Sequence, residues 1–204
     1  KDLPSRNEVR EALIKKLSEM KHEGRLPDVI TYAGNGEPTI HPDFPGIIDD
    51  CVEVRDIYSP KAEIVVLTNA TMIHKKEVAV ALNKVDQNVL KLDTVKQDTY
   101  KILNCPASGN NINTVINNLI KLPGRKIIQT LFLKGTYKGI SIDNTREEEI
   151  SGLIDAYKQI KPDKVMVYTF ARDTAFRGLE KIPFIVLKSI AQRINEAGFL
   201  TEVS

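Results

Sequence analysis

Residues 30–42 read Ile30-Thr-Tyr-Ala-Gly-Asn-Gly-Glu-Pro-Thr-Ile-His-Pro42, an apolar segment that runs into glycines followed at once by one carboxylate. The apolar start is typical of a short buried strand. Glycine has no Cβ and tolerates positive φ, so the backbone here can approach a small molecule closely. Glu37 then offers a fixed acceptor for an ammonium group, and Pro38 restricts the backbone after it. The pattern indicates a strand end that faces a ligand, with an ordinary strand-to-loop turn as the alternative.

Helical and extended patterns alternate along the rest of the chain. Two segments, Ser5-Arg-Asn-Glu8 and Thr145-Arg-Glu-Glu148, match the capping box that starts a helix. The expected strands cover residues 29–33, 64–67, 89–92, 126–133, 165–168 and 199–203, and the expected helices cover residues 5–24, 44–58, 75–85, 111–122, 145–160 and 183–197. This alternation predicts an α/β fold with a parallel sheet covered by helices, either open and doubly wound or barrel-like.

Polar residues follow each expected strand at its carboxyl end. They are Asn35 and Glu37, Thr68 and Asn69, Asp93, Lys134, and Thr169 with Arg172. In parallel α/β folds ligands bind at this edge, so the clusters predict one extended site, although every strand end also needs turn residues. The segment Thr136–Asn144 is expected to form a long loop there that acts as a lid.

Three polar side chains stand out within the apolar strands. Lys91 and Asp93 are two residues apart and share a face, which predicts an ion pair or a contact of Lys91 with a ligand carboxylate. A solvated Lys91 on an edge strand is the alternative. Gln129 interrupts a core strand, so its amide either bonds neighbouring backbone or faces a cavity. The histidines show no catalytic spacing, and none is assigned to catalysis.

Composition limits the classes of protein that fit. The 204 residues suit one domain over positions 1–204, and 29 basic against 27 acidic residues give a formal charge of +2 without a basic stripe. This disfavours a nucleic-acid partner. The sequence has no apolar run near the roughly 20 residues that cross a bilayer, which predicts a cytoplasmic protein without a membrane partner. Cys51 and Cys105 lack a CxxC partner, so we expect free thiols packed as small hydrophobic groups and no metal site.

The order of the motifs resembles the radical S-adenosylmethionine enzymes. Within them it resembles a group of small Fe-S oxidoreductase-like proteins that carry G-N-G-E-P-T-x-H-P after the second barrel strand. Here that motif is followed by Leu67-Thr-Asn-Ala-Thr71 and then Leu90-Lys-Leu-Asp93. The resemblance extends from Leu3 to Asp173, and the order of the motifs makes it more specific than any one of them.

The resemblance implies a partial (β/α)6 TIM-like barrel that binds S-adenosylmethionine across its carboxyl edge. The implied cofactor-binding residues are Gly34, Asn35, Gly36, Glu37 and Pro38 at the methionine ammonium, Asn69, Lys91 and Asp93 at its carboxylate and the ribose, and Gln129 and Tyr168 at the adenine. The implied activity is reductive cleavage of the cofactor to a 5′-deoxyadenosyl radical, which takes hydrogen from an unknown substrate. The implied electron donor is a reductant such as flavodoxin or ferredoxin.

One departure from the family pattern concerns the [4Fe-4S] cluster, which the family holds on a CxxxCxxC loop after its first strand. The sequence has no such loop, so we expect a chain that lacks the first strand and the cluster loop and is inactive as it stands. No catalytic residue and no metal ligand is assigned. A cluster-less, non-catalytic S-adenosylmethionine- or nucleotide-binding module is the alternative. A third possibility is an aldolase-like lyase with Lys91 as its Schiff-base lysine.

Overall fold

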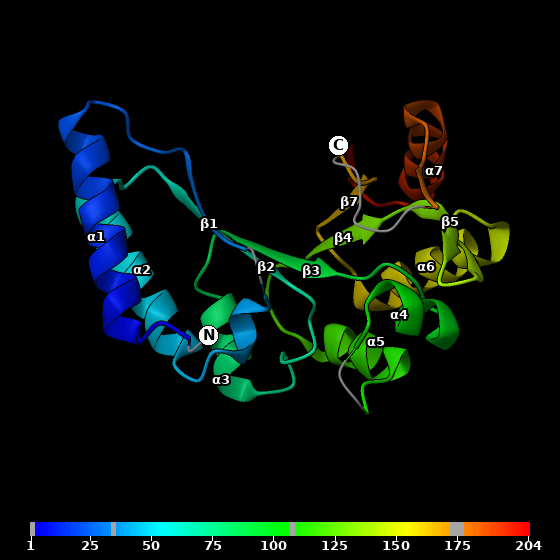
Figure 1. The fold of residues 1–204 in the computed structure, drawn as a ribbon, viewed down its shortest axis with the longest axis horizontal. Coiled ribbons are helices and arrows are strands. Elements are labelled where there is room, and N and C mark those ends of the chain that lie inside the picture. Colours follow the sequence, from blue (N-terminus) through cyan, green and yellow to red (C-terminus); the bar gives the residue numbers. More distant parts are fainter. Residues whose placement is uncertain (1–2, 34–35, 107–108, 172–177) are drawn as a thin grey trace. The chain divides into compact units, whose positions relative to one another are not determined.

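The computed structural model describes residues 3–33, 36–106, 109–171 and 178–204 (Figure 1). The chain divides into two compact units. Unit 1 comprises Lys1–Val89 with Leu122–Arg125, and unit 2 comprises Leu90–Lys121 with Lys126–Ser204. The expectation of one domain over residues 1–204 stays a prediction, and each unit is described by itself. Within the described ranges, no helix is both long enough and apolar enough to cross a bilayer.

Unit 1 alternates helices with parallel strands. Its elements are α1 (Arg6–His22), β1 (Val29–Tyr32), the 3-10 turn η1 (Pro38–Ile40), α2 (Phe44–Tyr58), β2 (Glu63–Thr68), α3 (Lys76–Leu82) and the first part of β3 (Gln87–Lys91). β1 and β2 pair in parallel, with Ile30 opposite Ile64. The apolar face predicted for α2 is buried, and Cys51 lies fully inside it.

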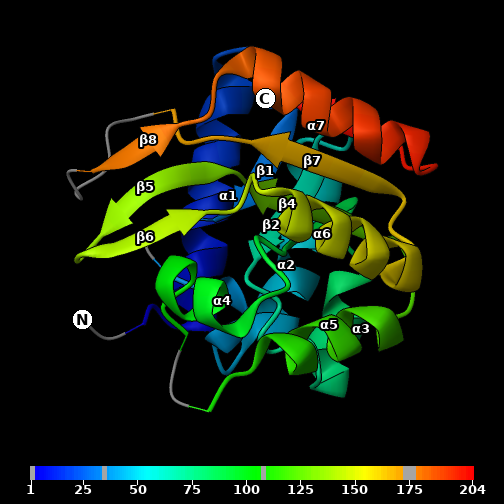
Figure 2. The ribbon, with the colours of Figure 1, turned by 90° about the vertical axis from the view of Figure 1, so that its right-hand side faces the viewer.

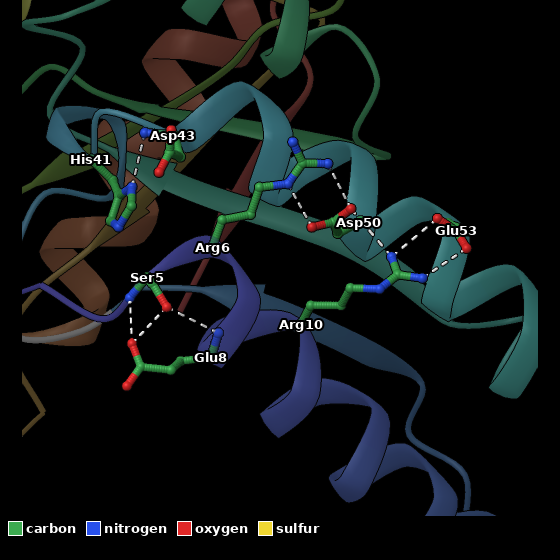
Figure 3. Close-up of polar contacts among 8 residues, drawn as sticks. All are labelled: Ser5, Arg6, Glu8, Arg10, His41, Asp43, Asp50 and Glu53. Atoms are coloured by element: carbon green, nitrogen blue, oxygen red, sulfur yellow. Dashed lines mark hydrogen bonds and ion pairs between the residues drawn. The ribbon is translucent and has the colours of Figure 1, made fainter.

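Charged side chains join α1 to α2 (Figure 3). The Arg6 guanidinium donates to both carboxylate oxygens of Asp50 at 2.7 and 2.8 Å, and Arg10 reaches the same carboxylate at 3.2 Å and Glu53 at 2.8 Å. The capping box predicted at Ser5 is formed in full, so the sequence signal for the start of α1 is confirmed.

Unit 2 contains a parallel sheet and a small antiparallel sheet. Its helices are α4 (Gln97–Leu103), α5 (Ile112–Lys121), α6 (Glu147–Ile160) and α7 (Phe184–Glu196). Its strands are β4 (Ile127–Leu131), β5 (Leu133–Tyr137), β6 (Ile140–Asp143), β7 (Lys164–Tyr168), β8 (Leu179–Lys181) and β9 (Thr201–Val203). β7 pairs in parallel with both β4 and β9, and β5 lies between β6 and β8 in the antiparallel sheet (Figure 2).

The core of unit 2 lies on the α6 side of the parallel sheet. Tyr157 of α6 is fully buried, and its hydroxyl is 2.6 Å from that of Thr130 on β4. Val165 and Val167 of β7 are buried, whereas Met166 and Tyr168, which point to the other face by the period of two, are half-buried. The predicted α/β class with parallel strands covered by helices is therefore confirmed.

Several expectations about local structure are wrong. The segment expected to be a lid loop is the β5–β6 hairpin, whose turn residues Lys138 and Gly139 take φ values of 48° and 81°. A turn in which two successive residues have positive φ matches the twist of the two paired strands. The polar composition of the segment is equally typical of a loop, so the sequence did not distinguish the hairpin from one. The strand expected over residues 126–133 ends at Leu131, and β5 starts as a separate strand.

The prediction that Thr145–Glu148 forms a second capping box is also wrong. Helix α6 has Arg146 as its N-cap, with no side-chain cap, because the Thr145 hydroxyl donates to Asp143 at 2.6 Å instead. Asp143 therefore competes successfully for the hydroxyl that would have capped the helix. Helix α4 was not predicted at all, and α3 ends earlier than expected, at Leu82.

Candidate functional site

In unit 1 the Glu37 carboxylate joins the loop after β1 to the end of β2. Its Oε1 accepts from the Thr68 hydroxyl at 2.6 Å and from the backbone N–H of Thr39 at 3.1 Å. Its Oε2 accepts from the backbone N–H of Asn69 at 2.7 Å. Because each carboxylate oxygen has two lone pairs, Oε2 retains capacity for a further donor. Glu37 is thus held in one position by intramolecular donors and can still receive a hydrogen bond from an ammonium group.

The residues next to Glu37 leave space beside it. A Cβ built on Gly36 would meet no atom within 4 Å, and its φ lies outside the left-handed region. Neither packing nor backbone conformation within the chain therefore requires glycine at this position. Pro38 begins η1, with Glu37 as its N-cap. Gly34 and Asn35 lie outside the described residues.

Asn69 turns its side chain back on its own loop. Its Oδ1 accepts from the backbone N–H of Thr71 at 3.0 Å and from the Thr71 hydroxyl at 2.6 Å. This is the Asx turn that asparagine commonly makes two residues ahead. With Oδ1 occupied, the exposed Nδ2 group is the part of the side chain suited to an acceptor on a ligand.

In unit 2, Lys91 and Asp93 form the ion pair that their spacing predicted, with Lys91 Nζ 3.3 Å from Asp93 Oδ2. The Asp93 side chain is 1% exposed and that of Lys91 33% exposed. The Asp93 carboxylate also accepts from the backbone N–H of Leu131 at 2.8 Å and from the Asn104 amide at 2.7 Å. Asp93 is therefore the buried counter-ion that fixes Lys91, and Lys91 is the member of the pair that reaches the surface.

Tyr168 lies close to this pair. Burial raises the pKa of Tyr168, and the charge of Lys91 opposes that rise. Burial lowers the pKa of Lys91, but Asp93 and Tyr168 raise it more, so the net shift is upward. Gln129 is half-buried on β4 and pairs in register with Met166 of β7, on the face of the sheet that also holds Tyr168.

The predicted site residues thus fall into two sets. Glu37 and Asn69 are joined by a hydrogen bond in unit 1. Lys91, Asp93 and Tyr168 interact electrostatically in unit 2. Each set lies where a strand ends or just beyond it, as expected for the ligand-binding edge of parallel strands.

Comparison of the sequence with known proteins yields distant relatives, and no family model matches the chain. A protein described as GTPase Obg from Brachyspira hyodysenteriae is 28% identical over 167 residues, which is 80% of this chain and 23% of that protein. The UPF0026 protein slr1464 from Synechocystis sp. is 26% identical over 144 residues, 69% of this chain and 49% of that protein. The chain therefore spans less than half the length of either relative.

Comparison with solved structures is more informative about the fold. SuiB from Streptococcus suis was solved with S-adenosylmethionine bound. Its match covers 96% of this chain and 43% of the SuiB chain, at 19% identity and a TM-score of 0.65. The match to a radical SAM methyltransferase from Sphaerobacter thermophilus covers 98% of this chain and 57% of the methyltransferase chain, at 12% identity and a TM-score of 0.67. The fold is that of the radical S-adenosylmethionine enzymes. The expected fold class is confirmed by these neighbours.

Two further matches extend this comparison. A domain of pyruvate-formate lyase-activating enzyme from Bacteroides vulgatus is similar over 86% of this chain and 98% of that domain, at 15% identity and a TM-score of 0.62. SuiB has also been solved bound to its precursor peptide SuiA, at 21% identity over 95% of this chain and 42% of its own, with a TM-score of 0.60.

The radical S-adenosylmethionine fold implies an iron–sulfur cluster, which needs thiolate ligands. Among the described residues, no group of three His, Cys, Asp or Glu side chains could hold a metal ion. Both cysteines are free: Cys51 is buried in α2, and Cys105 is exposed just after α4. The described residues therefore do not fit a [4Fe-4S] cluster. The expectation that both thiols pack inside the protein is confirmed for Cys51 and wrong for Cys105, since α4 ends before that residue.

Two residues that the sequence analysis did not single out hold the strand ends together. Asn104 bonds the Asp93 carboxylate, as described above. Asn144 is fully buried; its Nδ2 donates to the carbonyls of Asp93 and Leu131 at 2.9 and 2.6 Å, and its Oδ1 accepts from Leu133 N–H at 2.8 Å. Asn144 stands in a polar run after β6, where asparagine is common in turns, so the sequence carries no signal for this role.

Proposed function

We propose that this chain is the S-adenosylmethionine-binding core of a radical S-adenosylmethionine enzyme. The observation that carries the proposal is the Glu37 carboxylate, which is held beside an unobstructed glycine and keeps acceptor capacity on Oε2. This arrangement supports a contact to the ammonium group of the methionine moiety. The radical S-adenosylmethionine fold of the chain supports the same assignment.

The remaining site residues have the chemistry that the rest of the cofactor needs. Lys91 is a partly exposed cation suited to the methionine carboxylate, and Asp93 keeps it charged and in place. Asn69 offers its amide to a ribose or carboxylate oxygen. Gln129 and Tyr168 offer a polar edge and an aromatic ring for the adenine. Bound next to a reduced cluster, S-adenosylmethionine would supply the radical. The described residues offer no set of cluster ligands, so we assign this chain binding and orientation of the cofactor.

Calorimetric titration with S-adenosylmethionine tests the proposal. The wild-type chain should bind. Glu37→Gln removes the negative charge of the carboxylate that is proposed to contact the ammonium group, so it should weaken binding at least tenfold. Glu23→Gln is the matched control, because Glu23 is an exposed carboxylate of the same unit and pairs with Arg25 at 2.7 Å. No binding by the wild type, or equal binding by Glu37→Gln, would contradict the proposal.

Catalysis is tested separately. After anaerobic incubation with iron, sulfide and dithionite, the chain should bind S-adenosylmethionine but release no 5′-deoxyadenosine, since no three-thiolate set is found in its described residues. Release of 5′-deoxyadenosine would contradict this expectation. The expected compartment remains the cytoplasm, which suits the two free cysteines.

The second candidate is a cluster-less module that binds S-adenosylmethionine or a nucleotide without cleaving it. S-Adenosylhomocysteine lacks the sulfonium charge, so equal affinity for it and for S-adenosylmethionine would favour this module. The aldolase-like reading is disfavoured by the raised pKa of Lys91, because a Schiff-base lysine needs a lowered pKa to be a free amine near neutral pH.

A further inference from the structure

The histidine of the G-N-G-E-P-T-x-H-P motif, His41, bonds through both nitrogens of its ring. Nδ1 is 3.0 Å from the backbone nitrogen of Asp43, as Figure 3 shows, and Nε2 is 2.8 Å from the carbonyl oxygen of Pro4. A carbonyl can only accept, so Nε2 carries a proton, and a backbone N–H can only donate, so Nδ1 carries none. The two bonds together require the neutral ring with its proton on Nε2.

These bonds connect two parts of unit 1. His41 is the C-cap of η1 (Pro38–Ile40), and Glu37 is the N-cap of the same turn. The backbone N–H of Ile40 donates to the carbonyl of Glu37 at 3.3 Å within it. Pro4 directly precedes the N-cap of α1. The ring of His41 therefore joins the turn that carries Glu37 to the start of α1.

The turn from Glu37 to His41 is held at both ends. At one end the Glu37 carboxylate bonds to Thr68 and to the backbone that follows β2. At the other end the ring of His41 bonds to Pro4. Thr39 lies between the two, 2% exposed, and its backbone N–H donates to Glu37 Oε1 at 3.1 Å. Because these residues form one short hydrogen-bonded turn, a displacement of His41 also displaces a donor to the Glu37 carboxylate.

A second proton on the ring would be bound at Nδ1, where it would point at the N–H of Asp43 and replace a hydrogen bond by a contact between two donors. The charged side chains of α1 and α2 in Figure 3 bond to one another or to Ser5; they are Arg6, Glu8, Arg10, Asp50 and Glu53. The carboxylate of Asp43 is the anion next to the ring (Figure 3). A charged ring that turns toward it gives up the bond to Pro4, so the neutral ring alone makes both contacts.

We propose that His41 is a positioning residue for the S-adenosylmethionine site: its neutral ring ties the turn that carries Glu37 to the start of α1, and protonation of the ring releases this turn and weakens binding of the cofactor. Histidine changes its charge between about pH 5 and 8, so affinity should fall across this range as the pH is lowered. The inference rests on the proposed function and adds regulation by pH to the same site. His74 provides a contrast, because its Nδ1 donates to the Thr71 carbonyl at 3.0 Å and keeps that bond when the ring is charged.

Nitrogen NMR of the ligand-free chain tests the structural part of this proposal. At pH 8 the ring of His41 should carry its proton on Nε2. As the pH is lowered to 5.5, the protonation of His41 should shift the amide signal of Thr39, because the turn is released and this donor to Glu37 moves. A proton on Nδ1 at pH 8, or a titration of His41 that leaves the Thr39 amide unchanged, would overturn the proposal.

Calorimetry with S-adenosylmethionine at pH 8 and pH 5.5 tests the effect on the cofactor. Between these pH values the affinity of the wild type should fall about threefold to tenfold more than that of His41→Asn, which corresponds to the loss of one hydrogen bond. The asparagine oxygen can accept from the N–H of Asp43 two residues ahead and does not titrate. His41→Gln, which keeps a donor for Pro4, is a second variant that does not titrate and should behave like His41→Asn.

His74→Gln is the matched control and should follow the pH profile of the wild type, since protonation leaves the bond of His74 to Thr71 in place. Any titration of the cofactor itself is common to all four chains. Binding with the same pH profile in the wild type and in both His41 variants would overturn this inference alone. Absence of binding by the wild type at pH 8 would overturn the proposed function as well, so the two failures are distinguishable.

Discussion

The Thr68 hydroxyl donates a 2.6 Å hydrogen bond to Oε1 of Glu37, and it also accepts from the backbone N–H of Ala70 at 3.1 Å. Thr68 is 4% exposed at the end of β2. One buried hydroxyl thus fixes both the carboxylate proposed to bind the cofactor and the loop that follows the strand. Glu37 depends on a neighbouring strand for its position.

We expect Thr68→Val to lower the free energy of unfolding by about 1–3 kcal/mol, because the isosteric change leaves a buried N–H and a carboxylate oxygen short of a partner. Affinity for S-adenosylmethionine should fall as well, since Glu37 loses one of the donors that hold its carboxylate. Urea denaturation and calorimetry measure the two effects. Thr71→Val, in the same loop, is the control and should cost less than half as much, because the Asn69–Thr71 bonds are exposed. A Thr68→Val chain as stable as the wild type would contradict this role.

Gly36→Ala should leave stability within about 0.5 kcal/mol of the wild type, since its Cβ would meet nothing within 4 Å. The added methyl group should nevertheless weaken S-adenosylmethionine binding at least tenfold, because it occupies the space beside Glu37. Gly24→Ala is the opposite control: its φ of 69° makes alanine strained, so stability should drop by about 1 kcal/mol while binding is unchanged. Unimpaired binding by Gly36→Ala would show that the ligand does not approach there.

Replacing Lys91 tests the ion pair with Asp93. Lys91→Met should cost about 1–2 kcal/mol of stability, because the almost fully buried Asp93 loses its cation. The pKa of Lys91 is raised on folding, so its contribution is present below pH 10.5 and is lost as the pH rises through the folded value. The wild type should therefore lose stability relative to Lys91→Met above that pH, as measured by urea denaturation between pH 8 and 11.5. If the free energies of unfolding of the two chains change in parallel with pH over this range, the Lys91–Asp93 ion pair does not contribute as described.

Asp50 should make unit 1 sensitive to acid. The hydrogen bonds from Arg6 hold the pKa of Asp50 below its ordinary value of 3.8. The pair therefore stabilises the fold above that pH, and this stability is lost as the pH falls through the folded pKa. Asp50→Asn should remove this part of the acid transition. Asp49→Asn is the matched control, because Asp49 pairs with the exposed Lys84. The experiment measures unfolding of each chain from pH 6 to pH 2. If Asp50→Asn loses stability in acid in the same way as the wild type does, the role of the pair is contradicted.

The two thiols should differ in reactivity. Burial raises the pKa of Cys51, which is fully enclosed in α2, whereas Cys105 is exposed. Because the thiolate is the reactive form, a thiol reagent should label one cysteine rapidly and the second after denaturation. Cys105→Ser should abolish the rapid phase, and Cys51→Ser should leave it intact. Two rapid phases in the wild type would mean that α2 is not packed as described.

Local sequence signals were enough to predict several elements. The capping box at Ser5 fixed the start of α1, and the apolar period of residues 44–58 gave α2 with its correct ends. The spacing of Lys91 and Asp93 was enough to predict their ion pair, since residues two apart on a strand share a face. These features depend on residues close together in the chain, which is why pattern alone finds them.

Features that depend on residues far apart in the chain could not be predicted from local patterns. Thr145 was expected to cap α6, but its hydroxyl bonds Asp143, which is in place because β6 pairs with β5. Glu37 takes its donors from the end of β2, 31 residues further on in the case of Thr68, and Asn144 binds the Asp93 carbonyl across 51 residues. A buried polar group must find its partner among whatever groups folding brings near it. The sequence therefore indicated which polar residues follow the strand ends, and only the packed structure determined which of them are exposed and which hold the others in position.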